Sequence, residues 1–337
     1  MRIKKVYKRK FFKFSCAIIA FVLALFVFFL GIQSPVKKNT FFDVTRGVNV
    51  SMVAEQLKDY DLIDSIPLFK LSVRANGGQI QTGKYNIPKG ASVWRIAGML
   101  AKGDVATVTI VVPEGLTVKQ IKKLLLETDT LTGNVECGKG TDLPVCKLND
   151  GDLFPDTYTV AMGTSRLAFL DLMRKKMENT KSAWEKAGRI IPKPLRNWND
   201  IITLASIIQK ETPKTSEMPL VASVYLNRLQ KGMRLQADPT VVYALTDGLG
   251  DMRGAPLLRG HLKVSSPYNT YLHFGLPPAP IANVGIDAIK AVLQPADTNY
   301  LFFVADGKGG HKFAKSYKEH MKNHASWREV KKIKNTQ

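Results

Sequence analysis

The sequence predicts an α+β protein with an N-terminal transmembrane helix, a small α+β domain and a larger, mixed but mainly helical domain. Three observations lead to this prediction. A long apolar run lies near the N-terminus, a glycine-centred pattern recurs over residues 41–126, and amphipathic helical patterns dominate residues 151–330. Residues 127–150 between them are polar and glycine-rich, so we expect a linker or loop there.

The apolar run predicts a membrane anchor. Residues 14–32 form a run of 19 mostly apolar residues, which is long enough to span a bilayer. No good small-residue cleavage site follows, which favours an uncleaved anchor over a signal peptide. Residues 1–13 carry seven basic residues and no acid. The positive-inside rule therefore keeps this tail in the cytoplasm and predicts a single-pass protein of the inner (cytoplasmic) membrane whose domains are extracytoplasmic.

The charge of the chain indicates a polyanionic partner. The formal net charge is +21, and the chain remains strongly basic without its N-terminal tail. Such a field favours nucleic acid, anionic lipid or an acidic cell-wall polymer. Export of everything after the anchor argues against nucleic acid.

The pattern in residues 41–126 consists of two matching copies and a partial third. Their glycines are Gly47, Gly90 and Gly115, and each copy predicts a short strand, a glycine turn, an Asn, Ser or Thr cap and an amphipathic helix. The pattern resembles LysM-like modules, which are associated with binding N-acetylglucosamine polymers. A purely structural α+β spacer is the alternative, and the spacing does not separate the two.

The cysteines suggest one structural cross-link. Cys16 lies inside the predicted anchor, whereas Cys137 and Cys146 flank a polar loop. An oxidising exterior would allow these two to pair. The alternative is two unpaired thiols.

One helical pattern of the second domain ends in a candidate catalytic residue, Glu211. Ile201, Leu204 and Ile208 form a buried stripe, and position 211 is the next on that stripe. Pro213 disfavours helical geometry at the residue before it, so the helix should end near Glu211. Burial and the negative end of the helix dipole both raise a carboxyl pKa, as a general acid requires. The alternative is a surface glutamate at a frayed helix end.

Side chains suited to a sugar follow downstream, because aromatic rings stack on pyranose faces and polar groups bond hydroxyls. The candidate substrate-binding residues are Asn227, Arg228, Gln236, Asp238, Tyr268, Asn269, Thr270 and Tyr271. Asn227 and Arg228 could instead be solvated helix positions, and Asp238 could belong to a simple turn. Glu217 is expected in the first turn of the following helix, without a catalytic role.

Other chemistries lack their sequence signals. The five histidines show no metal-ligand spacing, and three of them are expected on the surface: His311, His320 and His324. There is no nucleotide-binding loop, no Gly-x-Ser-x-Gly motif and no cysteine placed as a nucleophile. We therefore expect no metal and no cofactor.

Six blocks in order resemble the YceG-like (MltG) endolytic murein transglycosylases. They are residues 204–212, 221–229, 233–243, 267–271, 275–282 and 303–311. The likeness covers the whole chain, from basic tail and anchor through the LysM-like region to the catalytic domain, and it implies that Glu211 of the Lys-Glu-Thr block is the catalytic residue. Gln209 stands where many members carry a second glutamate, so position 209 cannot supply the acid here. Ala279 replaces a usual glycine away from the chemistry.

The resemblance implies lytic cleavage of the β-1,4 bond between N-acetylmuramic acid and N-acetylglucosamine in nascent strands. The products would carry 1,6-anhydro ends, elongation would stop, and peptidoglycan strands and synthases would be the partners. Glu211 would act as acid and then as base, because a tethered C6 hydroxyl replaces the water for which a hydrolase usually pairs two carboxyls. Two alternatives stay open: a water-using muramidase of the same fold and a non-catalytic peptidoglycan-binding scaffold.

Overall fold

The computed structural model describes residues 18–19, 21–22, 35–188, 190–249, 252 and 254–334. Within these ranges no helix is long and apolar enough to cross a membrane. The predicted anchor lies outside the described residues, apart from four positions within 14–32. The chain forms two compact units. The first runs to Thr109 and includes Thr159–Gly163, and the second comprises Ile110–Tyr158 and the chain from Thr164 onward.

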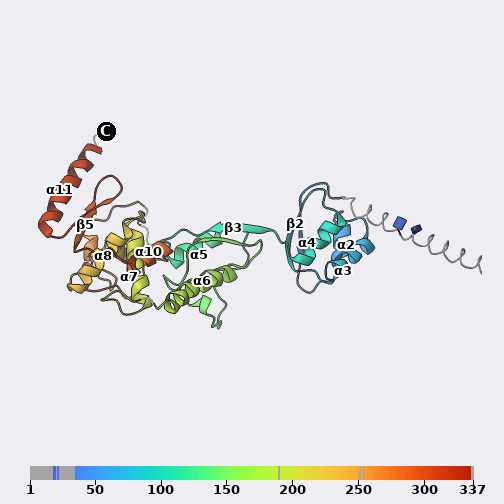
Figure 1. The fold of residues 1–337 in the computed structure, drawn as a ribbon, viewed down its shortest axis with the longest axis horizontal. Helices are drawn as coiled ribbons and strands as arrows, with labels where there is room; N and C mark the ends of the chain where they lie inside the picture. Colours follow the sequence, from blue (N-terminus) through green and yellow to red (C-terminus); the bar gives the residue numbers. More distant parts are fainter. Residues whose placement is uncertain are drawn as a thin grey trace, which may run out of the picture. The chain divides into compact units, whose positions relative to one another are not determined.

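The first unit is built on a two-stranded antiparallel sheet. Strand β1 (Thr40–Val44) pairs with β2 (Gly83–Ile87), and Phe42 lies opposite Tyr85 in the register. Both side chains are buried in one hydrophobic core with the helices. The helices are α2 (Val50–Asp59), α3 (Ile66–Ala75) and α4 (Val93–Lys102), and Figure 1 shows them beside β2.

The predicted strand, glycine turn, cap and helix pattern is confirmed in all three copies. Gly47, Gly90 and Gly115 have φ of 85°, 75° and 79°, which favours glycine because a Cβ strains this region. The caps are Asn49, Ser92 and Thr117, each accepting a hydrogen bond from a first-turn amide. The first two copies belong to the first unit, whereas the third glycine and its helix belong to the second. The LysM-like assignment and the domain limits stay predictions.

The second unit begins with elements that surround the polar stretch. Strands β3 (Thr107–Val111) and β4 (Thr157–Ala161) pair with each other and contribute residues to both units. Helix α5 (Val118–Leu126) and the 3₁₀ turn η1 (Pro144–Cys146) lie between them in the chain. In that turn region Cys137 and Cys146 form a disulfide. The 127–150 stretch, predicted as a linker or loop, is therefore part of the second compact unit.

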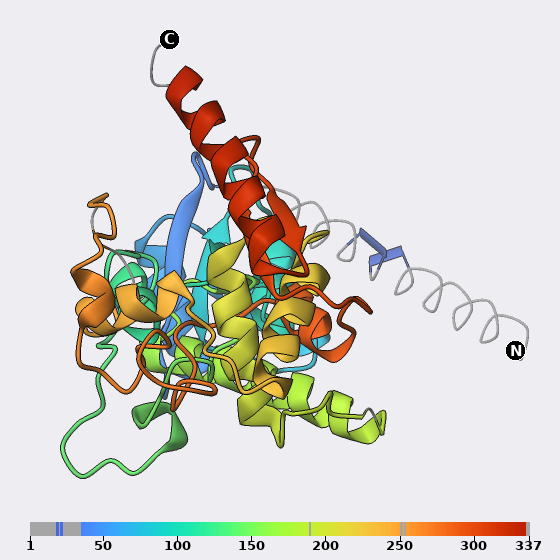
Figure 2. The ribbon, with the colours of Figure 1, turned by 90° about the vertical axis from the view of Figure 1, so that its left-hand side faces the viewer.

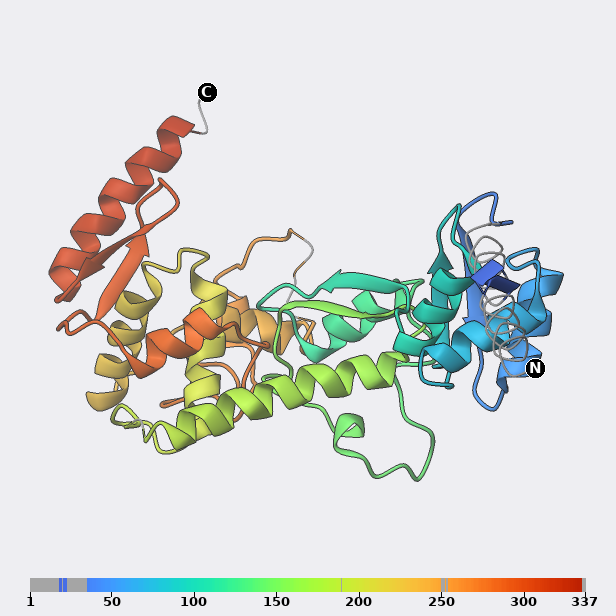
Figure 3. The same cartoon turned by 45° about the vertical axis from the view of Figure 1, so that its right-hand side comes forward.

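The rest of the second unit is mainly helical. Its helices are α6 (Arg166–Lys186), α7 (Trp198–Glu211), α8 (Met218–Gln230), α9 (Asp238–Leu245), the 3₁₀ turn η2 (His261–Lys263), α10 (Ile286–Leu293) and α11 (Tyr317–Lys334). Helix α7 packs against α8, α9 and α10 (Figure 3). The antiparallel hairpin of β5 (Phe302–Ala305) and β6 (His311–Ala314) packs against α11 (Figure 2). The predicted α+β class and the mainly helical second region are thus confirmed.

Candidate active site

Helix α7 is buried over most of its length and ends at a carboxylate. Asn197 caps its start, where its side chain accepts a hydrogen bond from the Asp200 amide at 2.9 Å. Nine consecutive residues, 200–208, are buried, so this stretch is covered on every face and has more than the one buried stripe that the sequence predicts. The helix ends at Glu211 as expected, because Thr212 is extended with φ −142° before Pro213.

A buried tyrosine of α8 holds the Glu211 carboxyl. The Tyr225 hydroxyl donates a hydrogen bond to Glu211 Oε1 at 2.8 Å. Tyr225 is 1% exposed, and its ring packs edge-on against Phe303 of β5 with centroids 5.8 Å apart. The ring therefore has one orientation, and it fixes one oxygen of the carboxyl.

Its surroundings raise the pKa of the Glu211 carboxyl to about 7. Burial is the largest cause, because loss of water destabilises the charged form. The negative charge of Asp238 adds to the rise, whereas the Tyr225 hydrogen bond and the Arg228 charge oppose it. Near neutral pH both protonation states are populated, so one group can release a proton and take one back.

Glu211 lines a cavity of about 250 Å³. The other lining residues are Lys210, Asp238, Pro239, Val242, Tyr243 and Ile281. Asp238 begins α9, and its Oδ1 accepts a hydrogen bond from the Tyr271 hydroxyl at 2.5 Å. The structure thus brings Asp238 and Tyr271, two of the predicted substrate-binding residues, close to the catalytic candidate.

Four other predicted substrate-binding residues make hydrogen bonds to backbone groups of the protein. Asn227 Nδ2 donates to the carbonyls of Thr298 and Tyr300, and Arg228 donates to those of Leu301 and Leu235. Asn269 and Thr270 are buried, and they bond backbone groups of the neighbouring loops. These hydrogen bonds give the four side chains a structural role, and their predicted role in sugar binding stays a prediction.

The last two predicted residues differ from each other. Gln236 is exposed in the left-handed region with φ 51°, and its backbone amide donates to the Thr270 carbonyl at 3.2 Å. Tyr268 packs against Tyr243 with ring centroids 4.8 Å apart, and both rings line a neighbouring cavity. Tyr268 therefore presents a sugar-sized aromatic face, whereas Gln236 shapes a turn.

Two predictions from the sequence are wrong: Glu217 does not lie in the first turn of α8, and the three histidines expected on the surface are partly buried. Glu217 is the cap residue before α8 but makes no side-chain cap; its Oε2 lies 2.7 Å from Nδ1 of His311. The β5–β6 hairpin brings His311 onto this carboxylate, and His320 and His324 of α11 are also half-buried rather than on the surface. Sequence spacing could not find this pair, because 94 residues separate its members.

Three site residues were missed by the sequence reasoning: Tyr225, Tyr243 and Asp150. Tyr225 had a usable signal, because a hydroxyl on the buried stripe of α8 needs a partner just as Glu211 does. Tyr243 and Asp150 are bonded to each other at 2.7 Å across 93 residues, which no local pattern reveals.

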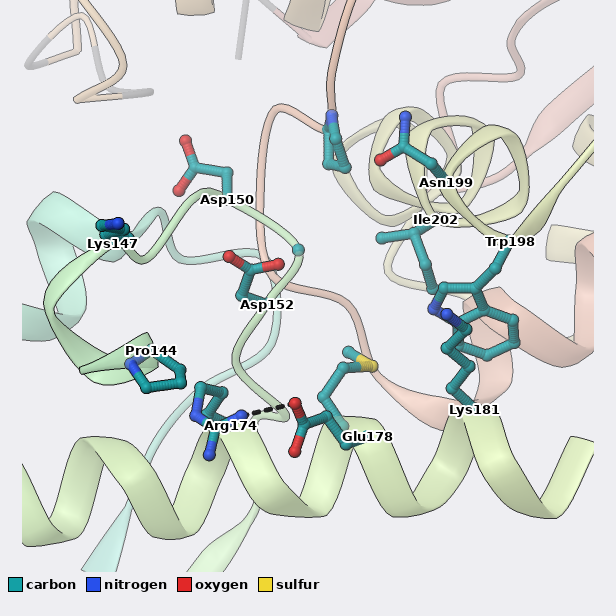
Figure 4. Close-up of a pocket in the computed structure, with 13 residues that line it drawn as sticks. Pro144, Lys147, Asp150, Asp152, Arg174, Glu178, Lys181, Trp198, Asn199 and Ile202 are labelled. Carbon is teal, nitrogen blue, oxygen red and sulfur yellow. Dashed lines mark hydrogen bonds and ion pairs between the residues drawn. The ribbon is translucent and has the colours of Figure 1, made fainter. Parts of the chain in front are cut away.

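A third cavity, of about 410 Å³, lies beside α6 and the start of α7. Side chains of both signs surround it, among them Asp152, Arg174, Glu178 and Lys181 (Figure 4). Arg174 is bound to both Asp171 and Glu178, so its charge is satisfied within the protein. In the described part of the chain, no group of three or more His, Cys, Asp or Glu side chains is placed to hold a metal ion.

Comparison with known proteins finds relatives that match most of this chain. The YceG-like family matches residues 42–326. A Bacillus subtilis protein named endolytic murein transglycosylase is 31% identical, over 88% of each chain. A Streptococcus pneumoniae protein of the same name is 27% identical over 87% of this chain, which spans 59% of that protein's length. A crystal structure of a yceG-like protein from Listeria monocytogenes aligns with TM-score 0.51 at 28% identity, over 85% of this chain and 99% of the other.

Proposed function

Because the chain belongs to the YceG-like family, we propose that it is an endolytic murein transglycosylase in which Glu211 is the catalytic acid and base. One observation carries the residue assignment. Glu211 is the carboxyl that ends a largely buried helix, lines a cavity and has a pKa of about 7. A group with this pKa is suited to give and take a proton at neutral pH.

The reaction needs no water. Protonated Glu211 donates its proton to the glycosidic oxygen, and the bond from C1 of N-acetylmuramic acid to that oxygen breaks. The C6 hydroxyl of the same sugar then attacks C1, and the Glu211 carboxylate takes the hydroxyl proton. The products are a free 4-hydroxyl on N-acetylglucosamine and a 1,6-anhydro ring, and Glu211 is protonated again. The nucleophile is tethered to its target, so little entropy is lost in the attack.

The neighbouring residues support both half-reactions. The Tyr225 hydroxyl stabilises the carboxylate form and orients it through the 2.8 Å hydrogen bond. Asp238 places a second negative charge in the cavity, where it would stabilise positive charge that develops at C1. Its Oδ1 is held by Tyr271, so it is positioned for this electrostatic role.

The rest of the chain would place the enzyme at its substrate. Residues 14–32 would anchor it in the cytoplasmic membrane with the N-terminus inside, and the basic exported part would attract the acidic wall polymer. The Cys137–Cys146 disulfide supports an oxidising exterior. The LysM-like units would bind glycan, and cleavage of nascent strands at the membrane would occur beside the synthases that make them.

Product analysis tests this proposal against its alternatives. Uncross-linked murein strands are digested with the purified full chain, and the fragments are weighed by mass spectrometry. A lytic transglycosylase yields internal fragments with 1,6-anhydro ends. Reducing ends would identify a water-using muramidase, for which Asp238 would be the second carboxyl, and intact strands would identify a scaffold.

A further inference from the structure

The cavity at Glu211 is too small to be the whole substrate site. Its volume is about 250 Å³, whereas ligand sites are usually about 300–1,000 Å³. A polymer cut internally must also continue on both sides of the scissile bond. The strand therefore has to leave this cavity along a neighbouring surface.

Helix α9 leads from this cavity to a larger one of about 640 Å³. Asp238, at the start of α9, lines the first cavity; Asp247, just beyond its end, lines the second. Tyr243 lines both, so its ring is the shared wall. All lining residues belong to the second compact unit.

The shared wall is rigidly built. The Tyr243 hydroxyl donates to Asp150 Oδ2 at 2.7 Å, and Asp150 Oδ1 accepts the Val118 amide at the start of α5 at 2.6 Å. The Tyr268 ring packs beside Tyr243 at 4.8 Å. Two fixed aromatic rings offer faces on which pyranose rings can stack at little entropic cost.

Two lysines give the larger cavity its positive groups. Lys119 pairs with Asp247 at 2.7 Å and Lys122 pairs with Glu136 at 2.8 Å. The carboxylates are exposed, with side-chain exposures of 100% and 64%. The Lys119 and Lys122 side chains are 53% and 23% exposed. Because the carboxylate of each pair reaches solvent, the pair contributes little net free energy, and the ammonium group can exchange its protein partner for a carboxylate of a ligand.

We propose that this larger cavity is a subsite for the strand segment next to the scissile bond. Tyr243 and Tyr268 hold its sugar, and Lys119 and Lys122 bind carboxylates of its peptide stem. The subsite rests on the proposed function, since it takes its ligand class from murein. It predicts that the enzyme recognises the peptide stem as well as the glycan.

Binding to a cleavage-deficient chain tests the subsite without depending on turnover. The background is full-length Glu211→Gln, and the ligands are uncross-linked murein strands and the same strands freed of peptide by an amidase, with the lactyl carboxylates so released converted to amides. The test variant adds Lys119→Ala and Lys122→Ala. The matched control adds Lys147→Ala and Lys181→Ala, which remove the same charge from the third cavity, where each lysine also forms an exposed ion pair.

We expect the test variant to raise Kd for peptide-bearing strands about tenfold, as two lost charge contacts would. Its Kd for peptide-free strands should stay within about twofold, and the control should match the background on both. Adding Tyr243→Ala in place of the two lysine changes should raise Kd for both ligands, because the sugar contact is lost. An unchanged Kd in the test variant, or an equal rise in the control, would overturn the subsite. Activity of the wild-type chain on the same strands separately tests the proposed function.

Discussion

Removal of the Tyr225 hydroxyl should move the pH dependence of cleavage upward. This hydroxyl donates to Glu211 Oε1 at 2.8 Å and thereby lowers the pKa of a carboxyl that burial and Asp238 raise to about 7. Tyr225→Phe keeps the ring and its packing against Phe303 but removes the donor. The Glu211 pKa should therefore rise above its present value, and the acid form should persist to higher pH.

The size of the shift follows from the strength of such a hydrogen bond. A bond to a charged group is worth about 1.5–3 kcal/mol, and one pKa unit corresponds to about 1.4 kcal/mol. The alkaline limb of kcat should therefore move up by about one to two pH units. The limb is measured from the release of anhydro-ended fragments between pH 5 and 9. At pH 7 the carboxylate form is scarcer, so the base step should become slower.

A tyrosine in the other unit supplies the control. Tyr85 is also fully buried, and its hydroxyl donates to the Gln81 carbonyl at 2.7 Å, so Tyr85→Phe should cost similar stability, about 1 kcal/mol. Its hydroxyl is bonded within the first compact unit, so Tyr85→Phe should leave the alkaline limb in place. If the alkaline limb of kcat stays in place or moves to lower pH in Tyr225→Phe, this hydrogen bond does not set the proton affinity of Glu211.

Three further predictions follow from the same contacts. Asp238→Asn should move the alkaline limb to lower pH, because the charge that raises the Glu211 pKa is gone, and should lower kcat; a rise would contradict this. Replacing Cys137 and Cys146 by Ser should lower the free energy of unfolding by about 2–3 kcal/mol in denaturant titrations, with cleavage retained. Protease added to spheroplasts should digest residues 33–337 and spare the tail; survival of the large domain until lysis would reverse the predicted topology.

Local patterns predicted local structure well. Each glycine turn with its cap and helix was predictable, because the turn and the cap are determined within a few residues. The helix that ends at Glu211 and the strand near Phe303 were predictable as well. The burial of α7 was predicted incompletely. The one-stripe interpretation missed that Thr203 and Ser206 are also buried, because only packing against three other helices covers those positions.

The site was predictable only in part for the same reason. Glu211 interrupts an apolar pattern, which a sequence displays, and the family resemblance supplied its role. Asn227 and Asn269 carry the same amide group that sugar sites use, and only the folded chain reveals that backbone carbonyls take their donors. The Tyr243–Asp150 bond joins segments 93 residues apart, so its contribution to the site arises from tertiary structure alone.

Cleavage by Glu211→Gln is the most direct test of the proposed catalytic role. The amide can fill the same space but cannot deliver a proton, and general acid–base catalysis is commonly worth about 10²–10⁴ in rate. Since one group serves both steps, we expect the release of anhydro-ended fragments to fall by at least about 10⁴-fold, with circular dichroism unchanged. The Glu217 carboxylate binds His311 and not the substrate cavity, so Glu217→Gln should still cleave the strands. Normal cleavage by Glu211→Gln, with Glu217→Gln inactive but folded, would show that the catalytic glutamate is Glu217.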